Sequence, residues 1–168
     1  YSDSFKSPLK INPQKEFSCI EYNQEIASAQ VKSCLILAAL FIKGEHVFYE
    51  KIPTRDHTEN LLQHFNYDMQ RTDNKLVISG QQKLIAKDIE IASDISSAAF
   101  FIVAALISEG SEIVIPNVNI NKYRTGIIKV LKKMKATINF KNIRDVSNEK
   151  VADIEIKYSK LESINLDG

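Results

Sequence analysis

The polar stretch Ser28-Ala29-Gln30-Val31-Lys32-Ser33 immediately precedes an uninterrupted apolar run, Cys34–Ile42. The apolar run predicts a buried helix, so the polar stretch occupies its N-terminal turn. Helix N-termini carry unpaired N–H groups and the positive end of the helix dipole, which together form a ready site for an anion such as phosphate. At that turn the Gln30 amide can both donate and accept a hydrogen bond. The alternative is that Ser28 and Ser33 only cap and solvate the first turn.

A second polar stretch, Thr-Arg-Asp-His-Thr-Glu, occupies residues 54–59. The planar guanidinium of Arg55 suits a phosphate, although a lone arginine is more often a solvated surface charge. Asp56, His57 and Glu59 together resemble an acid–base group. However, Asp56 and Glu59 are three residues apart at the start of a predicted helix, where the dipole favours carboxylates whatever the function. We therefore expect these two to cap the helix and His57 to point elsewhere.

Composition and residue spacing argue against several classes of function. The net charge is +1, and the lysines near residue 132 lack interleaved aromatic residues, so we expect no nucleic-acid binding. Two cysteines imply no disulfide framework and fit a reducing cytosol, with Cys34 behaving as a small hydrophobe. His46 and His64 have no ligand at zinc spacing, so no metal site is predicted. The apolar runs are shorter than the ~20 residues of a membrane span.

The elements that must position these residues form one design used twice. Each copy has a fully apolar run, then a glycine, a short strand pattern, a proline and a second helical stretch. The apolar runs are Cys34–Ile42 and Ala98–Ile107, and the second helical stretches are residues 56–65 and 123–134. A period this long indicates a duplicated supersecondary unit. We interpret residues 1–82 and 83–168 as two units of separate domains, linked near Gln81–Ala86.

Both units are predicted to have the order βαβαββ, which makes the chain α/β (α+β). The predicted strands are residues 18–22, 46–49, 68–70 and 76–79 in the first unit, and 87–91, 112–115, 137–140 and 153–158 in the second. Residues 142–150 are expected to be a long polar loop. The first helix of each unit is apolar around its whole circumference, so we expect both to be buried on all sides, with the sheets outside.

Four motifs occur in an order and spacing similar to those of the 5-enolpyruvylshikimate-3-phosphate synthases, also called 3-phosphoshikimate 1-carboxyvinyltransferases. The motifs are Ser28–Ser33, Thr54–Glu59, Asp94–Phe101 and Tyr123–Gly126. The resemblance implies the inside-out α/β fold of enolpyruvyl transferases, with two domains of three βαβαββ units each, parallel helices inside and ligands between the domains. On that plan the first unit resembles the last of one domain. The second resembles a unit of the other domain plus the strand leading to the next unit.

The resemblance also implies an activity. It is transfer of the enolpyruvyl group of phosphoenolpyruvate to the 5-hydroxyl of shikimate 3-phosphate, with release of phosphate, in the shikimate pathway to chorismate and the aromatic amino acids. It places shikimate 3-phosphate on Ser28, Ala29, Gln30 and Arg55, and phosphoenolpyruvate on Gln30. It further implies no cofactor or metal, a cytoplasmic location, no membrane partner and a mostly monomeric full-length protein. We interpret Asp94 and Arg124-Thr125-Gly126 as structural, with Gly126 permitting close packing.

Several parts of the family's site have no counterpart in these 168 residues. They are an N-terminal Lys-Ser pair, further arginines for phosphoenolpyruvate, a late Lys or Glu-Ser-Asp-Arg segment and a proton-transferring carboxylate expected beyond Gly168. We therefore predict no catalytic residue here and no activity for the chain alone.

Two alternatives are a non-catalytic binding or scaffold module of the same fold and an enolpyruvyl transferase acting on UDP-N-acetylglucosamine. The latter is disfavoured because that enzyme is recognised by a different loop with a reactive cysteine.

Overall fold

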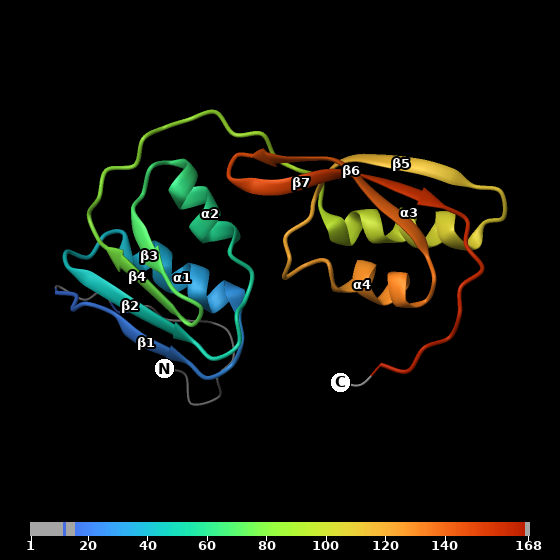
Figure 1. Ribbon diagram of the computed structural model, residues 1–168. Coiled ribbons are helices and arrows are strands. Elements are labelled where there is room, and N and C mark those ends of the chain that lie inside the picture. The colour runs from blue at the N-terminus through green and yellow to red at the C-terminus, as the bar shows by residue number, and fades with distance from the viewer. Residues whose placement is uncertain (1–11, 13–15, 167–168) are drawn as a thin grey trace.

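The computed structural model describes residue 12 and residues 16–166, which form two groups of elements joined at one end (Figure 1). The first group comprises β1 (Glu21–Gln24), α1 (Ala29–Ala39), β2 (Glu45–Glu50), α2 (His57–His64), β3 (Met69–Arg71) and β4 (Lys75–Ser79). Its sheet has the order β1-β2-β4-β3, with only β1 and β2 parallel. Because α1 connects that parallel pair, it is the crossover helix. The predicted βαβαββ unit is confirmed.

The second group comprises α3 (Ile95–Ile107), β5 (Glu112–Asn119), α4 (Gly126–Lys133), β6 (Thr137–Val146) and β7 (Glu149–Lys157). Its three strands form an antiparallel sheet of order β5-β7-β6. The strand predicted at residues 87–91 is wrong, because these residues form no strand. Two residues further on, Ser93 makes a single parallel bridge to Val118. The N–H of Asn117, which would extend that bridge into a ladder, instead donates to the Asp153 carboxylate at 2.9 Å. This unit is therefore αβαββ.

The predicted polar loop at residues 142–150 is also wrong, because β6 and β7 continue into a long hairpin. Its turn is Ser147-Asn148, with φ of 48° and 64°, and positive φ at both central residues is what a two-residue type I′ turn requires. The exposed arm around residues 141–145 is polar, which made it resemble a loop. The tip of the hairpin reaches α2 of the first group (Figure 1).

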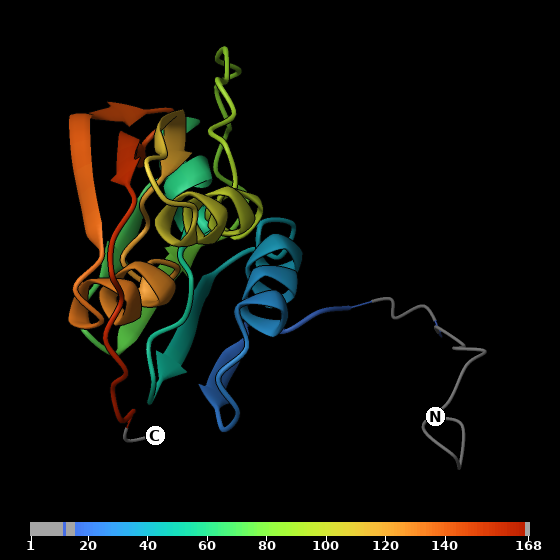
Figure 2. The same ribbon diagram turned by 90° about the vertical axis from the view of Figure 1, so that its right-hand side faces the viewer.

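Helices α1 and α3 each pack on a sheet through one face only (Figure 2). Ile36 of α1 and Ile102 of α3 are fully buried, whereas Leu37 is half exposed and Phe100 is 79% exposed. The prediction that both helices are buried on all sides is therefore wrong, and Cys34 is exposed as well. A helix covered by a sheet on one side needs a further layer on the other. The described part of the chain supplies no such layer.

Each group has its own apolar core. In the first, Ile36 packs with strand residues such as Phe48 and Ile78. In the second, Ile102 packs with strand residues such as Ile154. The segment between the groups, residues 83–91, is exposed throughout. Among residues 12 and 16–166, no helix is long and apolar enough to cross a membrane.

Candidate functional site

The first turn of α1 presents unpaired donors to a cavity. The Ser28 hydroxyl accepts a hydrogen bond from the Val31 N–H at 3.3 Å, so Ser28 caps the helix as one interpretation expected. Its own O–H hydrogen remains available. The N–H groups of Ala29 and Gln30 have no acceptor among the described residues. They lie at the N-terminal end of α1, which is the positive end of the helix dipole, as an anion site requires. Ser33, by contrast, bonds to the Thr58 hydroxyl of α2 at 2.6 Å.

Arg55 stands beside this turn, one residue ahead of the Asp56 N-cap of α2. It lines two adjoining cavities, of about 430 and 340 Å³, and Ala29 and Gln30 line both of them. Among the described residues, the ion pairs and hydrogen bonds of arginine side chains belong to Arg71, Arg124 and Arg144, and none involves the Arg55 guanidinium. Arg55 therefore lines the same cavities as the two residues whose N–H groups are unpaired. The structure brings together all four residues predicted to hold shikimate 3-phosphate, with Tyr123 of the second group on the same wall.

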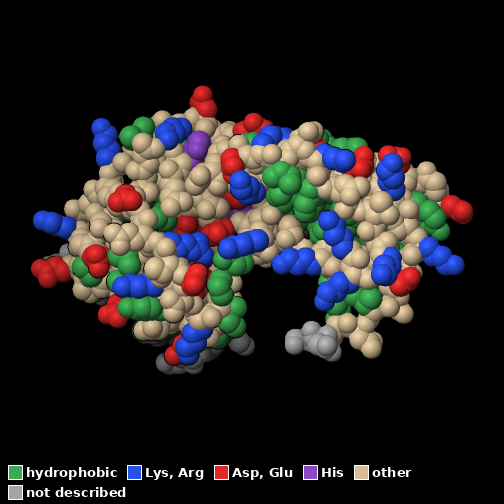
Figure 3. Space-filling model, viewed as in Figure 1, with side chains coloured by type: hydrophobic (Ala, Val, Ile, Leu, Met, Phe, Trp, Pro, Cys, Tyr) green, Lys and Arg blue, Asp and Glu red, His purple; other side chains and the backbone are tan. Residues whose placement is uncertain are grey.

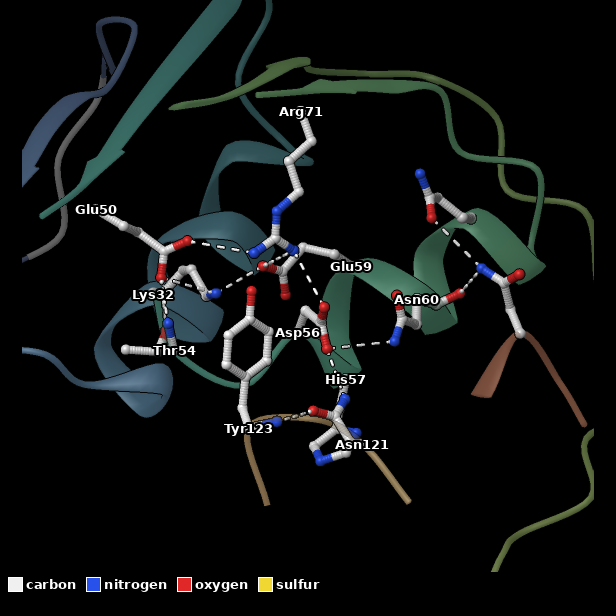
Figure 4. A network of polar contacts seen from close by, with 12 residues as sticks. Lys32, Glu50, Thr54, Asp56, His57, Glu59, Asn60, Arg71, Asn121 and Tyr123 are labelled. Atoms are coloured by element: carbon white, nitrogen blue, oxygen red, sulfur yellow. Dashed lines mark hydrogen bonds and ion pairs between the residues drawn. The ribbon is translucent and has the colours of Figure 1, made fainter. Parts of the chain in front are cut away.

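Next to these residues in the sequence and the fold lies a set of buried acidic and basic side chains, Lys32, Glu50 and Glu59, called here the buried charge cluster (Figure 4). The Lys32 ammonium is 3.0 Å from Glu50 Oε1 and 2.7 Å from Glu59 Oε1. Arg71 approaches the same two carboxylates from the edge, at 3.7 and 3.6 Å. Neither oxygen of Glu59 nor the Lys32 ammonium makes an aligned hydrogen bond among the described residues, so these two side chains meet only as a close ion pair.

Sequence reasoning missed Lys32, although a signal existed. Lys32, Ile36 and Ala39 recur at helical spacing and are the three buried residues of α1. Residues at i, i+4 and i+7 share one face of a helix, so the face that carries Ile36 into the core carries Lys32 there too. A lysine on that face needs a buried carboxylate partner, and Glu50 and Glu59 fill that role.

Glu50 also fixes the loop that leads to Arg55. Its Oε1 accepts the Thr54 N–H at 3.1 Å and the Thr54 hydroxyl at 2.7 Å. Burial alone would raise the pKa of the Glu50 carboxyl. The hydrogen bonds from Thr54 and the contact with Lys32 outweigh burial and hold that pKa below its ordinary value. Glu50 is therefore ionised at neutral pH.

The prediction that Asp56 and Glu59 cap α2 is wrong. Asp56 is the N-cap residue, but its side chain makes no capping hydrogen bond. Its carboxylate instead accepts the Asn121 amide of the second group at 2.6 Å and lies 3.4 Å from Arg71. Glu59 is buried against Lys32. Charged and amide donors from other elements thus take the carboxylates that the helix N–H groups would otherwise use.

His57 points away from Asp56 and Glu59, as expected, and reaches across to the second group. Its Nδ1 lies 2.8 Å from Glu149 Oε1 at the base of the hairpin tip. The amides of Asn60 and Asn119 also donate to Glu149, at 3.3 and 3.0 Å. Burial would raise the pKa of Glu149, but these hydrogen bonds hold it below its ordinary value. No signal in the sequence predicts this contact, because Glu149 lay within the predicted loop.

The second group's motifs have structural contacts. Asp94 caps α3 by accepting the Ser96 N–H at 3.2 Å and pairs with Arg124 at 2.7 Å. These contacts support the structural interpretation of Asp94 and Arg124, which stays a prediction. The close packing expected at Gly126 is wrong, since a methyl group there would meet nothing within 4 Å. Gly126 begins α4 at an exposed position.

Figure 3 shows lysine and arginine side chains around the hollow between the two groups. Taken with the unpaired donors of α1 and Arg55, the arrangement is that of an α/β protein with a candidate anion site at neighbouring helix N-termini. The chain belongs to the EPSP synthase (3-phosphoshikimate 1-carboxyvinyltransferase) family, whose model matches residues 1–167.

Relatives and solved structures of that family agree over nearly the whole chain. The 3-phosphoshikimate 1-carboxyvinyltransferase of Hydrogenovibrio crunogenus is 48% identical over 166 residues, which cover 96% of this chain and 37% of the relative. The enzyme of the same name from Ruthia magnifica is 44% identical and is covered to 38%. A solved EPSP synthase from Acinetobacter baumannii has a TM-score of 0.84 and 45% identity, covering 90% of this chain and 34% of that structure. The chain thus spans little more than a third of these proteins.

Proposed function

We propose that this chain is part of an enzyme that transfers the enolpyruvyl group of phosphoenolpyruvate to the 5-hydroxyl of shikimate 3-phosphate, releasing phosphate. The observation that carries the proposal is the free guanidinium of Arg55, which shares a cavity with the unpaired N–H groups of Ala29 and Gln30. The names of the relatives support the same reaction.

Different site residues bind the two substrates. The phosphate of shikimate 3-phosphate takes the Arg55 fork, the free hydroxyl hydrogen of Ser28 and the first N–H groups of α1. Ala29 has no polar side chain and leaves the backbone accessible. Gln30 lines both cavities, and we assign its amide to the place where shikimate 3-phosphate and phosphoenolpyruvate meet. These residues bind and orient the substrates, and the proton-transferring groups come from outside this chain.

We expect the purified chain to release no phosphate from phosphoenolpyruvate plus shikimate 3-phosphate, whereas the full-length protein that contains it turns over at ~1 per second or more. The chain supplies anion binding but no complete set of groups for proton transfer and charge stabilisation. A coupled phosphate assay on both proteins measures this. Turnover by the chain alone would mean that the catalytic residues are misplaced. A full-length protein inactive on this substrate pair would refute the proposed function.

In the full-length enzyme, we expect Gln30→Ala to lower kcat by up to about 100-fold, because a misplaced substrate pair loses the orientation that the transition state needs. Steady-state kinetics with both substrates measure this. The matched control is Gln70→Ala, which removes an exposed glutamine of β3. A Gln30→Ala variant that raised only a KM would place this residue in ground-state binding alone.

Further assignments accompany this proposal. Residues 1–82 and 83–168 belong to two domains, which is supported by their separate sheets and cores and by the exposed segment between them. The substrates are small molecules, and neither nucleic acid nor a membrane is a partner. The protein is cytoplasmic and monomeric; two free cysteines, Cys19 and Cys34, support a reducing compartment.

A further inference from the structure

The buried charge cluster joins three elements, and forming it costs the hydration free energy of its charged side chains. Lys32 is 1% exposed and Glu59 is 2% exposed, so both have given up most of their hydration. Ion pairs regain that loss only with good geometry and further hydrogen bonds, and apolar side chains of similar size often stabilise a protein as well or better. Both Glu59 oxygens lack such hydrogen bonds. Stability alone therefore does not account for the cluster.

The contacts of the cluster instead connect the two halves of the anion site. Lys32 follows Gln30 by two residues on α1, and Thr54 directly precedes Arg55. A single atom, Glu50 Oε1, contacts the Lys32 ammonium at 3.0 Å and accepts both donors of Thr54 at 3.1 and 2.7 Å. One carboxylate oxygen thereby sets the spacing between the first turn of α1 and the residue before Arg55.

We infer that Lys32 is a positioning residue for shikimate 3-phosphate, an inference that rests on the proposed function. Lys32 is absent from the walls of both cavities and does not touch the substrate. Its ammonium holds Glu50, Glu50 holds Thr54, and the Arg55 guanidinium is thereby kept on the same phosphate as the N–H groups of α1. The 2.7 Å contact of Lys32 with Glu59 ties the first turn of α2 into the same arrangement (Figure 4).

The test is Lys32→Met in the full-length enzyme, since methionine keeps an unbranched side chain and removes the charge. We expect the KM for shikimate 3-phosphate to rise about tenfold or more, with a smaller change in kcat. In the double variant Lys32→Met/Arg55→Ala, we expect that KM to lie within about twofold of Arg55→Ala alone, because residues that act through one another are not additive. If Lys32 had a purely structural role, Lys32→Met would reduce the folded fraction of the enzyme. That reduction lowers the apparent kcat and leaves KM unchanged.

Ile36→Val is the matched control, since Ile36 lies one turn further along the same buried face of α1 and packs in the apolar core of the first group. We expect its KM to stay within about twofold of wild type. If Lys32→Met does not fold, Glu50→Gln decides the question, because it keeps the shape and removes the charge of the shared carboxylate. We expect a KM increase of about threefold or more for Glu50→Gln.

An unchanged KM in Lys32→Met, or in Glu50→Gln where that variant must stand in, would overturn the inference. Effects of Lys32→Met and Arg55→Ala that multiply in the double variant would also overturn it, because they would make the two residues independent. Failure of the proposed function is recognised separately. In that case the wild-type enzyme itself does not turn over shikimate 3-phosphate and phosphoenolpyruvate, and the positioning role falls with it.

Discussion

Replacing Arg55 by alanine in the full-length enzyme should raise the KM for shikimate 3-phosphate by about 30- to 1000-fold, equivalent to ~2–4 kcal/mol. Arg55 lines both cavities at the first turn of α1, and the arginine ion pairs of the described residues involve only Arg71, Arg124 and Arg144, so no carboxylate there competes for its guanidinium. A phosphate bound there therefore receives the whole fork. Because the phosphate is present in both the ground and transition states, its loss removes uniform binding, and kcat should change little.

Steady-state kinetics with shikimate 3-phosphate varied at saturating phosphoenolpyruvate measure this effect. Arg144→Ala is the matched control, because Arg144 is exposed on the hairpin and pairs with Asp153 away from the cavities. Its KM should not move beyond about twofold. If Arg55→Ala itself stays within about twofold of wild type, under ~0.5 kcal/mol, the phosphate role assigned to Arg55 is wrong.

Truncating Ile154 to alanine should destabilise the chain by ~2–5 kcal/mol, the usual cost of a cavity left by a fully buried isoleucine. Ile154 of β7 is 0% exposed and packs in the second core, which contains Ile102 of α3 and Ile138 of β6. Urea unfolding measured by circular dichroism gives the change in the free energy of unfolding.

The control for that measurement is Ile143→Ala in the neighbouring strand β6. Ile143 is 59% exposed, so the same truncation there should change the free energy of unfolding by no more than ~0.5 kcal/mol. An equal loss of unfolding free energy in Ile154→Ala and Ile143→Ala would contradict the assigned burial of β7. The two variants remove the same atoms, one from a buried and one from an exposed isoleucine.

Elements whose contacts are local in sequence were predictable from periodicity and turn signals. Residues 46–49 and 76–79 lie in β2 and β4, and the polar turn between residues 71 and 74 joins β3 to β4. The grouping of Ser28, Ala29, Gln30 and Arg55 around one cavity was predictable too, because these residues lie at the starts of α1 and α2. Short-range signals of this kind do not depend on what the rest of the chain does.

Features that depend on distant partners were not predictable from the same signals. The extended hairpin resembles a loop in sequence because its arm is polar, and the strand expected at residues 87–91 is prevented by the bond from Asn117 to Asp153. The burial of α1 was misjudged for a related reason. Composition records that a helix is apolar, whereas the neighbours that cover it are specified elsewhere.

The contact between His57 and Glu149 joins residues 92 positions apart. This separation has a consequence for the order in which the two groups fold and dock during synthesis. The first group needs nothing beyond Ser79 to complete its sheet, so it can fold as it leaves the ribosome. Glu149 follows several seconds later at about 5–20 residues per second. During that interval the carboxylate of Asp56 and the ring of His57 are hydrated, and docking of the second group replaces that water last. Conditions that slow translation should therefore prolong the undocked state without delaying the folding of the first group.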